Sequence, residues 1–523
     1  MEKIIYPSVT ERWDVFEIRI PGKTDGNPFT DCRISGEFSG PSETVRTDGF
    51  YDGNGEYVVR FMPDEEGDYR FTIHGDFSDS IPLPVRGSFH VTPAKDGNHG
   101  PVDVCDTHHF RYRDGTPYYS LGTTCYAWVH QPEELQEETL RTLRTAPFNK
   151  IRFCIFPKHY DYNYAEPLTY PFEGSPCDTA DLNRSTMQRF TEEKKGNHWD
   201  FTHLSPGHFR RFDRRIRQLM EMGIQADLIL FHPYDRWGFD GMGAENDDRY
   251  VRYVVARYAA CRNVWWSLAN EYDYIRSKTR EDWERIGALI SDTDPFGRLC
   301  SVHNGPAFFD FTRPWVTHCS CQGTNRYNSV ERTDELLETY RKPVVWDEVL
   351  YEGNLDLGWG NITGEELVRR FWEATMRGGY IGHGETLLQD VSDVDHAILW
   401  WSHGGSLHGE SAPRIAFLRR ILEETPGGKG LHMLPGYWDT IAAAPSGDED
   451  GSYRIYYFSY LRPLFRDFYL DDTTDYEVEI LDTWRMEIRP QGIFRGHFRI
   501  ILDGEPYQAV RIRRCVSQPT SVQ

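Results

Sequence analysis

Residues 263–271, NVWWSLANE, form an apolar run that ends abruptly at Asn270 and Glu271. A short apolar run that is rich in β-branched and aromatic residues is typical of a strand buried on both faces. Downstream, PVVWDE (343–348) has the same form and ends at Glu348. We therefore expect two buried strands, each of which presents a glutamate at its carboxyl end.

Six further apolar runs surround these two, and polar loops or amphipathic segments separate them. A parallel sheet follows from strands that alternate with helices, and eight strands favour a (β/α)₈ TIM barrel over an open doubly wound sheet. No GxGxxG or GxxxxGK[ST] motif follows any run, which counts against dinucleotide and P-loop sites. The six runs are YYSLGTT (118–124), KIRFCIF (150–156), GIQADLILF (223–231), RLCSVHN (298–304), VTHCSCQ (316–322) and GGYIGHGE (378–385).

The regions on either side of the barrel predict small all-β domains. EYVVRFMPDEEGDYRFTIHG (56–75) alternates polar and apolar residues around an acidic turn, which is typical of a hairpin. The predicted fold class is α/β, with an Ig-like β-sandwich over residues 1–95, the barrel over 105–431 and a second β-sandwich over 432–523. The polar, aromatic segment 157–205 is too long for a simple βα loop, so we expect it to fold over one mouth of the barrel.

Composition and charge indicate which binding partners and which cellular compartment to expect. The chain has 523 residues and a net charge of −23, without a basic stripe, so neither nucleic acid nor an anionic membrane is an expected partner. It shows no secretory signal and no apolar span, and its ten cysteines are scattered, which indicates a cytoplasmic protein with reduced thiols. Aromatic residues make up 14%, either as core filler or as the lining of a sugar-binding cleft.

Glu271 and Glu348 are the principal candidates for catalysis. They end the fourth and seventh strands, and side chains at the carboxyl ends of barrel strands share one face. Glycosidic bond cleavage needs two carboxyl groups, about 5 to 5.5 Å apart in a retaining enzyme and roughly 6.5 to 9.5 Å apart in an inverting one. The competing interpretation is that both glutamates are strand ends held in salt bridges.

WSLANE (266–271), followed by an acid at the end of the seventh strand, resembles clan A of the retaining glycoside hydrolases. The resemblance implies that Glu271 is the acid/base, Asn270 the donor to the sugar 2-hydroxyl and Glu348 the nucleophile. Three further stretches resemble the apiosidase-like barrel group, whose members carry flanking β-domains in some cases. They are PYYSLGTTCYAW (117–128), GGYIGHGETLL (378–388) and ILWW (398–401).

Other polar and aromatic residues at strand ends are predicted to line the substrate cleft. Arg152 is placed either to keep a catalytic carboxylate ionised or to form a buried structural ion pair. Glu385 is the reserve catalytic residue. Because the sequence has no HExxH or paired CxxC motif, we expect neither a metal nor a cofactor. The full set of predicted substrate-binding residues is Asn270, Arg152, His232, His303, Gln322, His383, Glu385, Trp400 and Trp401.

These features predict a retaining glycoside hydrolase that removes terminal glycosyl residues from oligosaccharides or glycosides by double displacement. In that mechanism Glu271 requires a raised pKa, while Glu348 remains ionised. Two alternatives stay open at this stage: an inactive carbohydrate-binding scaffold, and a transglycosidase that uses the same residues. The two terminal domains also offer surfaces for association into a homo-oligomer.

Overall fold

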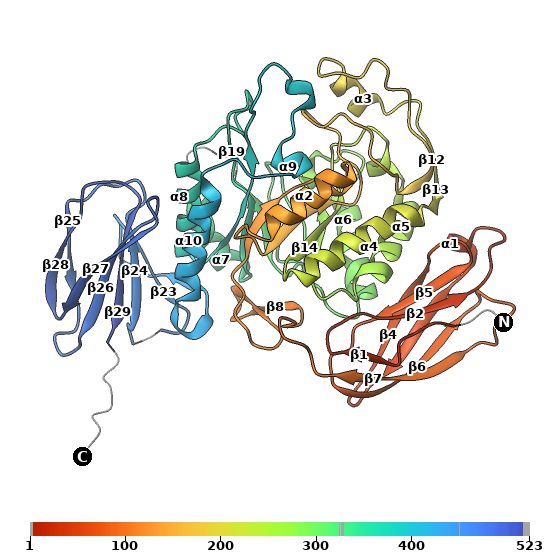
Figure 1. Cartoon of the computed structure of the whole chain (residues 1–523), viewed down its shortest axis with the longest axis horizontal. Coiled ribbons are helices and arrows are strands. Elements are labelled where there is room, and N and C mark those ends of the chain that lie inside the picture. The colour runs from red at the N-terminus through yellow and green to blue at the C-terminus, as the bar shows by residue number, and fades with distance from the viewer. Residues whose placement is uncertain (1–3, 324, 326–328, 449, 516–523) are drawn as a thin grey trace.

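Figure 1 shows a central barrel between two β-rich regions, the N-terminal one in red and orange and the C-terminal one in blue. The predicted domains at 1–95 and 432–523 include residues 1–3 and 516–523, which lie outside the described residues. No helix of the described chain is long and apolar enough to cross a membrane. The computed structural model describes residues 4–323, 325, 329–448 and 450–515.

The eight predicted barrel strands are confirmed, and each predicted run contains one strand. All neighbouring strands pair in parallel, in the order β16-β15-β14-β11-β10-β20-β18-β17. An isolated parallel bridge between His303, two residues after β16, and Ser320 on β17 links the two ends of the sheet, so the barrel is nearly closed. The strands are β10 (Leu121–Thr124), β11 (Lys150–Cys154), β14 (Gln225–Phe231), β15 (Val264–Ala269), β16 (Cys300–Ser301), β17 (Cys319–Gln322), β18 (Val344–Glu348) and β20 (Tyr380–His383).

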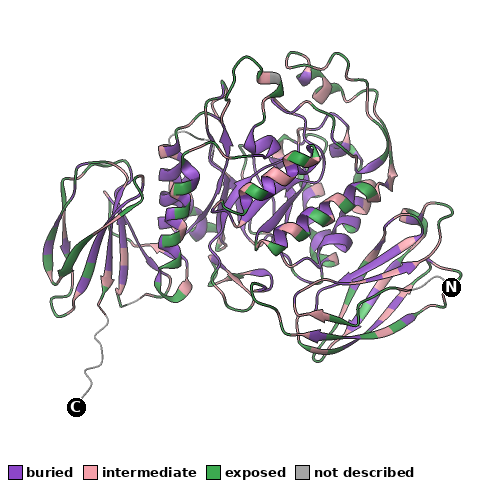
Figure 2. Cartoon of the chain, viewed as in Figure 1, coloured by how far each residue is buried: buried purple, intermediate pink, exposed green. Residues whose placement is uncertain are grey.

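The barrel strands are buried at every position except Gln322, the last residue of β17, because helices cover them on the outside (Figure 2). Helix α4 shows how the sequence achieves this: Phe209, Phe212, Ile216 and Leu219 recur at helical spacing and are buried, while basic residues alternate with them. The helices around the barrel are α2 (Glu133–Leu143), α4 (Pro206–Glu221), α5 (Ala244–Tyr258), α6 (Arg280–Thr293), α7 (Thr333–Tyr340), α8 (Gly364–Met376) and α10 (Ser411–Glu423).

Short elements occupy the loops between barrel strands and helices. The predicted 157–205 insertion contains the antiparallel pair β12 (Phe172–Ser175) and β13 (His198–Leu204) and the helix α3 (Met187–Glu193). The other short elements are β19 (Glu352–Gly353), β21 (Glu385–Thr386), α9 (Trp400–His403), η1 (Trp128–His130), η2 (Phe239–Gly241), η3 (Tyr272–Tyr274), η4 (Val330–Arg332), η5 (Val394–His396) and η6 (Pro426–Gly428).

A cluster of buried charges fills the barrel interior. The Nζ atom of Lys150 lies 2.9 Å from Asp227 and 2.6 Å from Asp347, and the Nε of Arg152 lies 3.4 Å from Asp227. Lys150 and Arg152 hold the pKa of Asp347 well below its usual range, despite its burial. Each charge has an opposite charge beside it, as burial in a low-dielectric interior requires.

The N-terminal β-rich region is one seven-stranded sheet in the order β1-β7-β6-β3-β4-β5-β2. The sheet folds over, since the ring of Phe16 on β2 stacks on that of Phe89 on β7 at 3.7 Å. The predicted Ig-like sandwich topology stays a prediction. The elements are β1 (Val9–Glu11), β2 (Phe16–Pro21), α1 (Pro28–Asp31), β3 (Ile34–Ser39), β4 (Thr44–Tyr51), β5 (Glu56–Phe61), β6 (Gly67–Gly75) and β7 (Val85–Thr92), followed by the linker hairpin β8 (Val102–Cys105) and β9 (His109–Tyr112).

Arginines attach this sheet to the barrel. Arg257 on α5 donates to Asp52 of the sheet at 2.8 Å, and Arg60 on β5 donates to Asp213 on α4 at 2.8 Å. All four side chains are largely buried, so the contact has a fixed geometry. The N-terminal region is therefore docked on α4 and α5 rather than joined to the barrel only through a linker.

The C-terminal region pairs its strands in the order β22-β23-β24-β29-β26-β27, and β25 and β28 form a separate pair. It packs on the barrel through α8, where the ring of Trp372 lies 5.6 Å from that of Tyr457. The strands are β22 (Leu431–Met433), β23 (Ile441–Pro445), β24 (Tyr453–Tyr457), β25 (Phe465–Tyr469), β26 (Tyr476–Asp482), β27 (Glu487–Phe494), β28 (His497–Ile501) and β29 (Gln508–Arg514).

Candidate active site

A cavity of about 270 Å³ lies at the carboxyl ends of the barrel strands and contains both predicted catalytic glutamates. Its wall is mostly aromatic, and the remaining side chains are polar or charged apart from one leucine. The lining residues are Tyr126, Lys158, Tyr160, Tyr234, Asn270, Glu271, Tyr274, Gln322, Glu348, Leu350, Tyr351, Trp359 and Trp401.

Glu271 follows β15 in the left-handed backbone conformation, with φ of 49°. This conformation is unusual for a residue with a side chain, and such residues cluster at functional sites. Three groups donate hydrogen bonds to its carboxylate: the Tyr234 hydroxyl, Asn270 Nδ2 at 3.2 Å and Gln322 Nε2 at 3.0 Å. A β-bulge before Gln322 breaks the register of β17 against β18.

The pKa of Glu271 is raised to about 7, first because the side chain is buried and second because Glu348 carries a like charge nearby. The hydrogen bonds from Tyr234 and Gln322 and the charge of Lys158 act in the opposite direction. Near neutral pH, Glu271 can therefore hold a proton and release it, as general acid–base catalysis requires.

Glu348 ends β18 and accepts a hydrogen bond from the hydroxyl of Tyr126. The same hydroxyl lies 3.2 Å from Asn270 Oδ1 and 3.3 Å from the hydroxyl of Tyr351. Because Asn270 also donates to Glu271, a series of polar contacts runs from one glutamate to the other through Tyr126 and Asn270. Their side chains are thus held in one polar network.

Lys158 is a further charged residue of the cavity that sequence reasoning missed. It lies four residues beyond β11, in the first part of the insertion, and only 4% of its surface is exposed. Its ammonium group lies 3.8 Å from the ring centroid of Tyr126 and 4.2 Å from that of Tyr234. Burial lowers the pKa of Lys158 to about 8, although both glutamates favour its charged form.

The structure brings five of the predicted site residues together in the cavity: Asn270, Glu271, Gln322, Glu348 and Trp401. Three other predicted residues are buried nearby but are not among its lining residues. Arg152 belongs to the ion cluster below, where its Nε lies 3.8 Å from Asp347. His232 contacts the carbonyl oxygen of Phe156 at 3.2 Å, and His303 is fully buried, with its backbone N–H donating to the carbonyl oxygen of Ala269 at 3.0 Å.

The remaining three predicted residues, His383, Glu385 and Trp400, contact other parts of the structure and are not among the cavity-lining residues. The ring of His383 stacks on Phe148, and its Nδ1 lies 3.1 Å from the hydroxyl of Thr123. Trp400 donates to that same hydroxyl at 2.9 Å. Successive strand residues point to opposite faces, so closeness to a strand end does not by itself place a side chain in the cleft.

Among the described residues, Glu352, His383 and Glu385 form a group whose potential metal-ligating atoms all lie within 4.8 Å of one another. The carboxylates of Glu352 and Glu385 already accept backbone hydrogen bonds from residues 408–411, which lead into α10. None of the three is among the residues that line the cavity. This group therefore connects the loops after β18 and β20 to α10.

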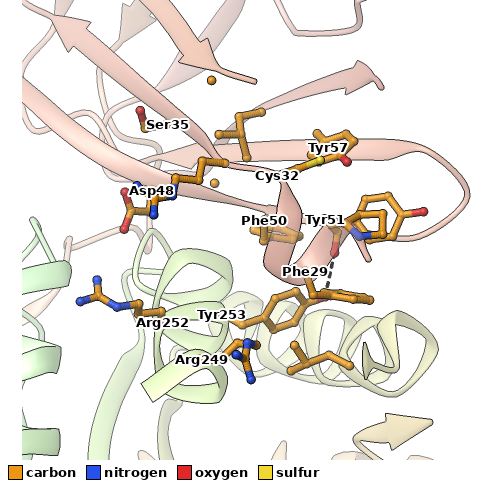
Figure 3. A pocket seen from close by; sticks show the side chains of 16 residues that line it. Phe29, Cys32, Ser35, Asp48, Phe50, Tyr51, Tyr57, Arg249, Arg252 and Tyr253 are labelled. Atoms are coloured by element: carbon orange, nitrogen blue, oxygen red, sulfur yellow. Dashed lines mark hydrogen bonds between the residues drawn. The ribbon is translucent and has the colours of Figure 1, made fainter. Parts of the chain in front are cut away.

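A larger cavity, of about 580 Å³, lies between the N-terminal sheet and α5 (Figure 3). Tyr253 on α5 donates to the backbone oxygen of Tyr51 across it, at 3.1 Å. Asp48 contributes the one carboxylate among its described lining residues. This cavity therefore lacks the two carboxyl groups that glycosidic bond cleavage requires, whereas the smaller cavity has them.

Each of the three parts of the chain matches the model of a known domain family. Residues 105–427 match the model of the apiosidase-like catalytic domain. Residues 9–76 and 438–513 match two domains of unknown function, DUF5060 and DUF5605. A comparison with curated proteins finds no match.

Two solved structures are similar over most of the chain. A candidate glycoside hydrolase from Bacteroides vulgatus ATCC 8482 has 36% sequence identity and a TM-score of 0.88, covering 97% of this chain and 100% of its own. A second structure, described as a glycoside hydrolase, has 14% identity and a TM-score of 0.58, covering 81% of this chain and 98% of its own, which shows a shared fold. The family model covers the barrel over residues 105–427, and the structure with 36% identity matches nearly the whole chain. The chain therefore belongs to the apiosidase-like family.

Proposed function

We propose that the protein is a retaining glycoside hydrolase that removes terminal glycosyl residues from soluble oligosaccharides or glycosides. The main observation behind the proposal is that Glu271 and Glu348 both line the same, mostly aromatic cavity. The raised pKa of Glu271 supports its role as the acid, because the group is half protonated near pH 7. The family membership and the 36% identical candidate glycoside hydrolase support the same class of reaction.

In the proposed first step, a carboxylate oxygen of Glu348 attacks the anomeric carbon, and the bond to the leaving oxygen breaks. Glu271 transfers its proton to that oxygen, so the aglycone leaves as a neutral alcohol. In the second step, Glu271 removes a proton from water, the water oxygen bonds to the anomeric carbon, and the ester to Glu348 breaks. Both glutamates return to their starting protonation states, and the product keeps the anomeric configuration of the substrate.

The shape of the cavity supports action on chain ends. Its volume of about 270 Å³ is slightly below the usual range of ligand pockets, which is about 300 to 1,000 Å³. Tyr160 from the insertion and Trp359 from the loop after β18 both line it, and their ring centroids lie 6.0 Å apart. We infer that these rings bound a pocket for one terminal sugar. A cytoplasmic place of action is also proposed, supported by the ten cysteines, which are all free.

The test uses a panel of aryl glycosides, including furanosides, with wild type and the variants Glu271→Gln and Glu348→Gln. We expect at least one glycoside to be cleaved with retention, seen by NMR of the first-formed anomer, and both variants to lose about 10³-fold or more in kcat. An inverted product would refute the nucleophilic role of Glu348. Equal weak cleavage by all three proteins would refute the proposed enzyme and favour a binding protein, and transfer to an added sugar acceptor would indicate a transglycosidase.

A further inference from the structure

The charge of Lys158 is not used by the double-displacement mechanism, yet it lies inside the same cavity. Four aromatic rings surround its ammonium group. Besides Tyr126 and Tyr234, Trp401 lies at 4.8 Å and Tyr160 at 5.4 Å from the Nζ atom. Aromatic faces attract a cation, but they accept hydrogen bonds only weakly. The ammonium group therefore has charge stabilisation from the rings without strong hydrogen-bond acceptors.

The other buried lysines of the described chain show what is missing. Lys150 lies 2.6 Å from Asp347, and Lys278 lies 2.5 Å from Asp247. Lys158 has no ion pair and no side-chain hydrogen bond to any described residue, although it is as buried as Lys278. A buried cation is costly unless it is paired and hydrogen-bonded. Because Lys158 lines the cavity, a molecule bound there can supply the missing partner of its ammonium group.

The catalytic glutamates favour the charged form of Lys158 from a distance, but neither forms an ion pair or a hydrogen bond with its ammonium group. Tyr126 donates to Glu348 and Tyr234 donates to Glu271, and these two tyrosines also turn their ring faces toward Lys158. Neither glutamate lies within the 4 Å of an ion pair with Lys158. The tyrosines thus separate the ammonium group from the carboxylates and leave it available to a bound molecule.

We propose that Lys158 is a specificity-determining residue that binds an anionic group of the substrate, so that the enzyme acts on acidic sugars. A carboxylate or sulfate on the sugar supplies the charged acceptor that the rings lack, and such charge-assisted hydrogen bonds are about twice as strong as neutral ones. A neutral hydroxyl leaves the buried charge unpaired. This inference rests on the proposed function, because it assigns the substrate class of the same cavity.

The experiment measures binding of free sugars by NMR titration, which needs no hydrolysis. The probes are glucuronate with glucose, galacturonate with galactose, and the 6-sulfates of both neutral sugars. The proteins are wild type, Lys158→Met, which keeps the length but removes the charge, and Lys158→Arg, which keeps a charge. Thermal unfolding of each variant establishes that the protein is folded.

We expect at least one acidic sugar to bind wild type about ten- to a hundredfold more tightly than its neutral counterpart. Lys158→Met should abolish that difference, and Lys158→Arg should restore part of it. Preference for a uronate identifies a carboxylated sugar, and preference for a sulfate identifies a sulfated one. Equal binding of acidic and neutral sugars by wild type, no binding of acidic sugars, or an equal loss of both in Lys158→Met would overturn the inference. These outcomes are independent of whether aryl glycosides are cleaved, so the two proposals fail separately.

Discussion

Replacing Tyr234 by phenylalanine should raise the pKa of Glu271. The Tyr234 hydroxyl donates to the Glu271 carboxylate, and a hydrogen bond to the charged form of an acid lowers its pKa. A hydrogen bond to a charged group is worth about 1.5 to 3 kcal/mol, which corresponds to about one to two pH units at 1.36 kcal/mol per unit. Because Asn270 and Gln322 still donate to the same carboxylate, we expect the lower value.

The assay is the pH dependence of kcat/KM on the aryl glycoside that wild type cleaves fastest. The acid must be protonated to work, so activity falls as the pH rises through the pKa of Glu271, which is about 7. A higher pKa keeps the acid protonated at higher pH. The alkaline limb of Tyr234→Phe should therefore move upward by about one unit, whatever the change in maximal rate.

Tyr160→Phe is the matched control for this shift. Tyr160 lines the same cavity and its ring lies 4.7 Å from that of Tyr234, but its hydroxyl makes no hydrogen bond to Glu271. Its alkaline limb should stay within about 0.3 units of wild type. An unmoved limb in Tyr234→Phe, or a shift toward lower pH, would refute the assignment of that limb to Glu271 and the role given to the hydroxyl.

Two substitutions test the forces that hold the barrel. Lys150→Met leaves two buried aspartates without their lysine and should lower the free energy of unfolding in urea by about 3 to 5 kcal/mol. The exposed Lys95→Met should lower it far less, because solvent screens the Lys95–Glu11 ion pair. Gly404 has φ of 84° and an added Cβ would lie 2.1 Å from Thr139 Oγ1, so Gly404→Ala should destabilise more than Gly97→Ala, which has φ of 83° and open space around it. Equal losses within either pair, measured by urea unfolding, would contradict the packing argument.

The barrel was predictable because its strands are buried on both faces. Runs such as GIQADLILF carry apolar residues at successive positions, and each of the eight runs contains a barrel strand. Asn270, Glu271 and Glu348 were found by the same reasoning, since the last residues of a barrel strand open onto one face. The position of the strand end was thus enough to predict that both glutamates lie at one cavity, while their catalytic roles stay a prediction.

The cavity wall was less predictable, because residues in βα loops form much of it. Tyr126, Tyr234 and Tyr351 follow their strands by two or three residues, and nothing in their spacing distinguishes them from core aromatics. A useful signal was their repetition: a tyrosine follows shortly after several different strand ends. His383 is the opposite case, because it ends β20 but stacks on Phe148 and is not among the residues that line the cavity.

Tyr126 and Tyr234 connect the two proposals, because in each the hydroxyl donates to a glutamate and the ring faces Lys158. The Tyr234 hydroxyl donates to Glu271, while its ring face lies 4.2 Å from the ammonium group of Lys158. A phenylalanine removes the first interaction and keeps the second. Tyr234→Phe should therefore shift the alkaline limb of activity and leave the preference for acidic sugars intact, whereas Tyr234→Leu should alter both. If Tyr234→Phe abolishes the preference, Lys158 depends on the ionisation of Glu271 rather than on the ring, and the anion-binding role assigned to it is wrong.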